Sequence, residues 1–209
     1  MSNMKSIERI KSKLEFLDEK REILIKLCRE VTRRSRLIIM SIQGGKFVDD
    51  KALEELYNLV RQIEEYRDTY PEIYFTGCSL NALTEYVEAM CLYNFVKNNN
   101  IPDLTDLDVK SEVAYLLGLA DLVGELRRYM LNKIMLNDFT NAKLALKTME
   151  TIYRELSNII TPEALAPGLR RKVDIMRIVL DNSFKDYLYA YKAFILERIF
   201  NEKIQKDDS

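Results

Sequence analysis

Val113-Ala-Tyr-Leu-Leu-Gly-Leu-Ala-Asp-Leu-Val-Gly-Glu-Leu-Arg-Arg128 is an apolar run that predicts a helix and holds two carboxylates. Between Val113 and Leu126 the only charged residues are Asp121 and Glu125, and their i, i+4 spacing places both on one helix face, which we expect to be buried. Because a buried carboxylate is costly unless a cation or hydrogen-bond donors meet it, the run requires Arg or Lys partners or a bound metal ion. The two glycines of the run suggest that something approaches this backbone closely.

Composition favours an all-α fold with a single domain over residues 1–209. The chain has 209 residues, of which 47% are hydrophobic and 31% charged, and it contains only 6 Gly and 4 Pro. We expect six long helices joined by short loops into an antiparallel bundle, with Asp106 to Asp108 capping the fourth helix and an irregularity near Gly77 in the third. The expected helices cover about residues 6–42, 49–68, 72–97, 108–135, 140–159 and 169–200. Residues 204–209 are expected to form a disordered tail.

Charge and residue usage exclude several classes of function. The formal net charge is −1, so nucleic-acid binding would require local clustering of Lys and Arg. The absence of histidine removes histidine acid–base catalysis and most zinc sites. Three cysteines, Cys28, Cys78 and Cys91, fit buried reduced thiols better than a disulfide framework. No apolar run reaches the roughly twenty residues that span a bilayer, and the charged first twenty residues do not resemble a signal peptide, so we expect a cytoplasmic protein.

The first expected helix combines an apolar seam with a basic stripe. Apolar residues recur every seven positions, as in a coiled coil; they are Ile10, Leu17, Leu24, Val31 and Ile38. On another face lies a basic stripe of four residues at spacings of 3, 4 and 3, namely Lys26, Arg29, Arg33 and Arg36. The stripe is either a surface for nucleic-acid phosphates or a solvated face balanced by nearby glutamates. The seam and the apolar third helix predict self-assembly.

A second acid pair, Glu85 and Glu88, lies on the third expected helix at i, i+3 spacing. If the third and fourth helices pack antiparallel, these acids and the pair Asp121 and Glu125 converge. Four hard oxygen donors then suit Mg²⁺ or Mn²⁺. In the alternative interpretation each acid pairs with a nearby cation, such as Arg127, Arg128 or a residue of the last helix.

Four segments of the chain resemble signature segments of the translin family. They are Glu85–Ala89 (EYVEA), Tyr115–Arg127 (YLLGLADLVGELR), Leu169–Arg177 (LRRKVDIMR) and Arg29–Arg36 (REVTRRSR). The resemblance covers nearly the whole chain, and the second segment is long and specific. Within that family, translin is a nucleic-acid-binding subunit, whereas translin-associated factor X carries the acid cluster of a metal-dependent ribonuclease. The four acids of this chain, Glu85, Glu88, Asp121 and Glu125, match the factor X pattern.

The resemblance implies a seven-helix α fold and an octameric hollow shell that handles RNA on its inner surface. A count of six helices then misses a split near Gly77 or Pro167. The first hypothesis is a Mg²⁺- or Mn²⁺-dependent endoribonuclease for single-stranded RNA within a homo-octamer. In it the four acids hold the metal and are catalytic, while the basic stripe with Arg127 and Arg128 positions the nucleic-acid backbone. The alternative is a non-catalytic scaffold that binds single-stranded RNA or DNA and whose acids are structural.

Overall fold

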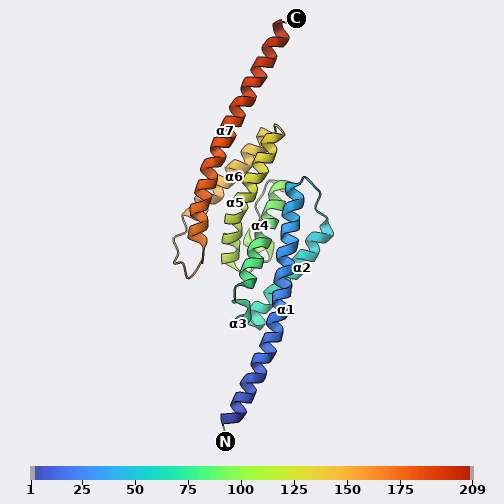
Figure 1. Ribbon diagram of the computed structural model, residues 1–209, viewed down its shortest axis with the longest axis vertical. Helices are drawn as coiled ribbons and strands as arrows, with labels where there is room; N and C mark the ends of the chain where they lie inside the picture. Colours follow the sequence, from blue (N-terminus) through green and yellow to red (C-terminus); the bar gives the residue numbers. More distant parts are fainter. Residues whose placement is uncertain (1–2, 208–209) are drawn as a thin grey trace. The chain divides into compact units, whose positions relative to one another are not determined.

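The computed structural model describes residues 3–207, and over these residues it contains helices and connecting loops without a strand (Figure 1). The α-helices are α1 (Asn3–Gln43), α2 (Asp50–Thr69), α3 (Pro71–Tyr74), α4 (Cys78–Asn98), α5 (Glu112–Met135), α6 (Phe139–Ser157) and α7 (Leu169–Asp207). A short 3-10 helix, η1 (Leu104–Leu107), lies between α4 and α5. The expected all-α fold is confirmed. None of the described helices is both long and apolar enough to cross a membrane.

The internal contacts divide the chain into two compact units, Met1–Gly118 and Leu119–Ser209. The first unit holds α1 to α4 and the start of α5, and the second holds the rest of α5 with α6 and α7. The prediction of a single domain over residues 1–209 stays a prediction.

In the first unit α2 runs antiparallel to α1, while α4 runs parallel to it. Arg34 pairs with Glu55 near the start of α2, whereas Phe16, earlier in α1, contacts Tyr70 directly after the end of α2. Along α4 the order is the same as along α1, since Cys28 lies beside Cys78 and Arg36 pairs with Glu85. The core of this unit is formed largely by α4, whose side chains are buried on most faces, as its nearly continuous apolar sequence predicts. On α1 the seven-residue seam is buried from Leu24 onward. Of its N-terminal members, Ile10 is exposed and Leu17 is half-buried. The neighbouring Ile7 and Leu14 are exposed as well.

The expected third helix is split into α3 and α4, so the predicted irregularity near Gly77 is confirmed. Pro71 starts α3, where its missing N–H has no helical partner to lose. Gly77 then adopts φ 98°, a left-handed conformation that side chains rarely allow, and α4 begins at the next residue.

The expected cap of the fourth helix at Asp106 to Asp108 is wrong. Asp103 and Asp106 instead form a reciprocal capping box around η1, and Asp108 ends η1 in the left-handed conformation. Helix α5 starts only at Glu112, and the hydroxyl of Ser111 accepts a hydrogen bond from the backbone N–H of Ala114 at 3.2 Å. The two caps lie close in sequence, and the aspartate-rich stretch belongs to the earlier one.

In the second unit consecutive helices alternate in direction. The Phe139 ring at the start of α6 contacts Tyr187 and Tyr191 on α7, with ring centroids 6.0 and 5.4 Å apart. Helix α7 ends at Asp207. The expectation of a disordered tail over residues 204–209 stays a prediction. Residues 208 and 209 lie outside the described residues.

Candidate functional site

The acid pair of α4 faces α1 within the first unit. The Glu85 carboxylate accepts two hydrogen bonds from Arg36, from Nε at 3.2 Å and from Nη2 at 2.6 Å. This two-point geometry is the strong form of an arginine–carboxylate pair. The Glu85 side chain is only 24% exposed, and Glu88, one turn further along, is half-buried. The Glu85 hydrogen bonds raise the pKa of Arg36, and the charge of Glu88 adds to that rise.

The acid pair of α5 lies in the second unit. Asp121 receives Lys172 Nζ from α7, and both side chains are half-buried. Glu125 is 17% exposed and lies 3.5 Å from Arg128 Nη1. The expected requirement for a partner is therefore met, at Asp121 by the last helix.

The expected burial of the α5 acid face is correct for its first part and wrong for its second. Ala114, Leu117 and Gly118 are buried, whereas Gly124 and Arg128 are exposed. The reason is local, since Val87 of α4 packs against Gly118 and no described heavy atom lies within 4 Å of a Cβ built at Gly124. This face therefore begins in the core and ends at the surface.

The chemistry of the four acids fits a divalent ion, although each pair lies in a different unit. Carboxylate oxygens are the donors that Mg²⁺ and Mn²⁺ prefer, and the cations now paired with Glu85 and Asp121 indicate that positive charge is stable at these positions. Within either unit taken alone, the described residues bring no three Asp, Glu or Cys side chains together at a metal-binding separation. A shared site for Glu85, Glu88, Asp121 and Glu125 stays a prediction.

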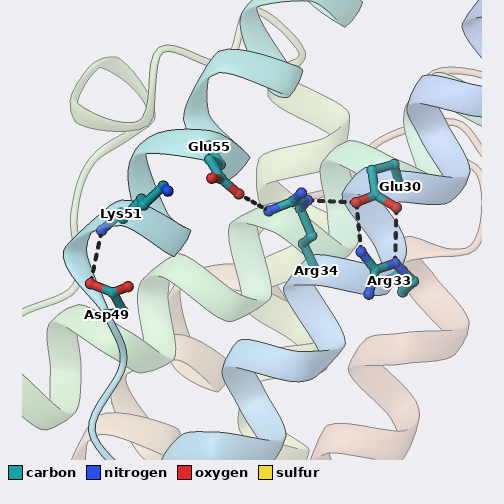
Figure 2. A network of polar contacts seen from close by, with 6 residues as sticks. All are labelled: Glu30, Arg33, Arg34, Asp49, Lys51 and Glu55. Carbon is teal, nitrogen blue, oxygen red and sulfur yellow. Dashed lines mark hydrogen bonds and ion pairs between the residues drawn. The ribbon is translucent and has the colours of Figure 1, made fainter.

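Arg33 of the basic stripe and its neighbour Arg34 are both paired with acids. Arg33 donates to Glu30 from Nε at 2.9 Å and from Nη2 at 2.7 Å, and Arg34 bridges Glu30 to Glu55 of α2 (Figure 2). These hydrogen bonds, with that from Arg33 the strongest, lower the pKa of Glu30 to about 2. Arg34 is absent from the predicted stripe because it is one position out of the spacing, and it serves the contact between α1 and α2.

A groove runs along the stripe within the first unit. It has a volume of about 530 Å³, and Arg29, Arg33 and Arg36 line it. Its remaining lining is mainly apolar and comes from α1 and the start of α4; it includes Ile25, Cys28, Leu37 and Cys78. Lys26 is exposed but does not line this groove. Three of the four stripe residues therefore gather at one concave surface, where guanidinium groups suit phosphate oxygens.

The cysteines are free thiols, as predicted. Burial raises the pKa of Cys28 to about 12, and the neighbouring Cys78 adds to the rise. Burial raises the pKa of Cys91 to about 12 as well. The proximity of Cys28 and Cys78 is not apparent from positions fifty residues apart in the sequence.

Arg127 and Arg128 differ in their surroundings. Arg127 donates from Nη1 to the buried Ser183 hydroxyl at 2.9 Å and from Nη2 to Asp186 at 2.7 Å, so it joins α5 to α7. Arg128 is 60% exposed. Of the two, Arg128 is the one with a solvent-facing guanidinium.

These features define an all-α protein with two half-buried acid pairs and an arginine-lined groove. The translin family model matches residues 19–182, and the chain belongs to the translin family. It is 34% identical over 171 residues to the uncharacterized protein MJ0175 of Methanocaldococcus jannaschii. The aligned region covers 81% of this chain and 75% of that protein.

Solved structures show the same fold. The structure of AfC3PO in complex with duplex RNA matches with a TM-score of 0.81 and 36% identity, over 90% of this chain and 97% of that chain. The structure of apo-NeC3PO matches with a TM-score of 0.76 and 26% identity, over 88% of this chain and 96% of that chain.

Proposed function

We propose that this protein is a Mg²⁺- or Mn²⁺-dependent endoribonuclease for single-stranded RNA, of the catalytic type that translin-associated factor X represents in the family. The observation that carries the proposal is that α4 and α5 each present two partly buried acids. One acid of each pair is held by a cation, Glu85 by Arg36 and Asp121 by Lys172. Carboxylates that are partly shielded from water need a cation, and a divalent ion such as Mg²⁺ prefers carboxylate oxygens as ligands.

Glu85, Glu88, Asp121 and Glu125 are the residues that would hold the ion. A divalent ion at such a site would lower the pKa of a bound water and would stabilise the charge that develops on a phosphate. The groove arginines Arg29, Arg33 and Arg36 bind and orient the RNA backbone, because phosphate contacts position a strand without reading its sequence.

RNA as the partner is supported by the likeness to AfC3PO, which has been solved in complex with duplex RNA. Single-stranded DNA remains a further candidate, since backbone contacts do not distinguish the two. Self-assembly, with a homo-octamer as the specific proposal, is supported by the exposed apolar start of α1. There Ile7, Ile10 and Leu14 are 63%, 57% and 60% exposed. The proposed location is the cytoplasm, on the grounds of composition.

One observation favours the alternative of a non-catalytic scaffold. The ion pairs Arg36–Glu85 and Lys172–Asp121 already neutralise one acid of each pair without a metal. In that case the acids stabilise helix contacts, and the groove binds single-stranded RNA or DNA without cleaving it.

A cleavage assay separates the two functions. Labelled single-stranded RNA is incubated with the protein in Mg²⁺, in Mn²⁺ and in EDTA. The proposal predicts metal-dependent cleavage that Asp121→Asn abolishes while RNA binding is retained. The exposed Asp181 of α7 offers a matched control, and Asp181→Asn should cleave normally. Binding without cleavage by the wild-type protein in any metal would establish the scaffold instead.

A further inference from the structure

Gly124 lies in the middle of α5, where glycine weakens a helix relative to alanine. The other glycine of this helix, Gly118, is required by packing, because a Cβ there would lie 2.6 Å from the Val87 side chain. At Gly124 an added Cβ would meet no described heavy atom within 4 Å. The packing of the described chain therefore gives no reason for glycine at this position.

Gly124 borders a pocket within the second unit. The pocket has a volume of about 250 Å³ and lies between α5 and α7. Asp121, Arg171 and Lys172 provide its polar lining, and the rest is apolar, including Ile175 and Met176. The Arg171 side chain is exposed, whereas Lys172 is paired with Asp121.

We infer that this pocket takes one unpaired nucleotide of the RNA, with the base against the apolar wall beside Gly124 and its phosphate at Arg171. The inference rests on the proposed function, because Asp121 belongs to both sites. A flat ring can approach the helix backbone more closely at a glycine than at a residue with a side chain. A phosphate attached to that ring complements the adjacent guanidinium.

The size of the pocket restricts what enters it. About 250 Å³ is smaller than the roughly 300–1,000 Å³ of pockets that enclose whole drug-sized ligands, so the pocket admits one ring system and not a longer stretch. A base inside a duplex is stacked and paired, and it enters such a pocket only when it is splayed out. The pocket thus selects single-stranded or locally opened RNA.

Nucleotide binding is measured without metal or cleavage. The buried Met176 lines the pocket, so its methyl NMR signal, assigned with a Met176→Leu variant, reports on the site. Adenosine 5′-monophosphate should shift this signal saturably, inorganic phosphate should not, and Gly124→Leu should abolish the response. No shift with the nucleotide, an equal shift with phosphate, or a response that survives Gly124→Leu would each overturn the inference.

Binding of single-stranded RNA provides the second measurement. Loss of one base from the apolar pocket should cost about tenfold in affinity, which is the increase in Kd expected for Gly124→Leu. Gly124→Ala should have an intermediate effect, and Arg171→Ala should also weaken binding. Arg177→Ala, an exposed arginine of α7 that does not line the pocket, is the control and should change Kd less than twofold.

Two outcomes separate this inference from its alternatives. If Gly124→Leu changes the mass measured by light scattering and leaves RNA affinity intact, the pocket receives a second copy of the chain, and the nucleotide inference is wrong. If the wild-type protein binds the nucleotide at this pocket but cleaves no RNA in Mg²⁺ or Mn²⁺, the nuclease proposal fails and the pocket stands.

Discussion

Replacing Gly118 or Gly124 by alanine makes the same chemical change twice in helix α5, and the two environments predict opposite effects on stability. A Cβ at position 118 would lie 2.6 Å from Val87 Cβ and Cγ1 and 2.9 Å from the backbone oxygen of Thr84. Overpacking of this kind costs typically about 1–3 kcal/mol, and a backbone contact cannot rotate away. Alanine regains about 1 kcal/mol of helix propensity at either position.

The backbone contact at Gly118 puts the overpacking cost in the upper part of that range, about 2–3 kcal/mol, so the net loss is about 1–2 kcal/mol. At Gly124 no described heavy atom opposes the new methyl group, so a gain of up to about 1 kcal/mol remains. For a chain of this length 1 kcal/mol shifts Tm by about 2–4 °C. Gly118→Ala should melt about 2–8 °C below the wild type, and Gly124→Ala up to about 4 °C above it.

The assay is thermal and urea unfolding of the three proteins at one protein concentration, followed by circular dichroism. Equal concentration matters because self-association would make the apparent stability depend on it. The reasoning is refuted if Gly118→Ala is as stable as the wild type, or if both variants shift in the same direction.

Three further predictions concern the basic stripe, the thiols and acid stability. Changing Arg33 and Arg36 to alanine should weaken single-stranded RNA binding. The slope of log K against log salt concentration, obtained from Kd at several salt concentrations, should flatten by about 0.7 for each lost phosphate contact. Burial raises the pKa of Cys28 to about 12, so at pH 8 iodoacetamide should modify the half-buried Cys78 first, as read by mass spectrometry. Hydrogen bonds lower the pKa of Glu30 from 4.5 to about 2, so its stabilising contribution is complete above pH 4.5 and is lost as pH falls toward 2. Glu30→Gln should therefore lose less stability than the wild type over that interval in urea titrations.

Each of these predictions has an opposing outcome. An unchanged salt slope would leave the stripe as a solvated face. Equal alkylation of the two thiols would contradict the burial of Cys28. Parallel acid titrations of the wild-type protein and Glu30→Gln would show that the ion pairs of Glu30 add nothing to stability.

The helices were predictable because their signals are local. Apolar spacing places α1, α2, α6 and the start of α7 within a few residues of their ends, and Pro71 and Gly77 mark the break before α4. The cap of α5 was not predictable, because three aspartates between residues 103 and 108 and one serine at 111 all satisfy the pattern of a helix start.

The residues of the candidate site were predictable by type and face, but their partners were not. Asp121 is paired with Lys172, 51 positions away, and Arg36 with Glu85, 49 positions away. Such pairs depend on which helices pack together and in which register. The buried Glu64 is another example, because it accepts from Tyr74 Oη and from the backbone N–H of Lys110, and neither partner follows from helical spacing.

Under the proposed function, Glu85, Glu88, Asp121 and Glu125 share a divalent ion. A crystal structure of the protein soaked in Mn²⁺, with anomalous scattering measured to locate the metal, tests it directly. The account predicts one manganese peak within bonding distance of carboxylate oxygens from both acid pairs, with Lys172 displaced from Asp121. Crystals in which no peak lies at these acids, and in which Arg36–Glu85 and Lys172–Asp121 remain paired at saturating Mn²⁺, would contradict it.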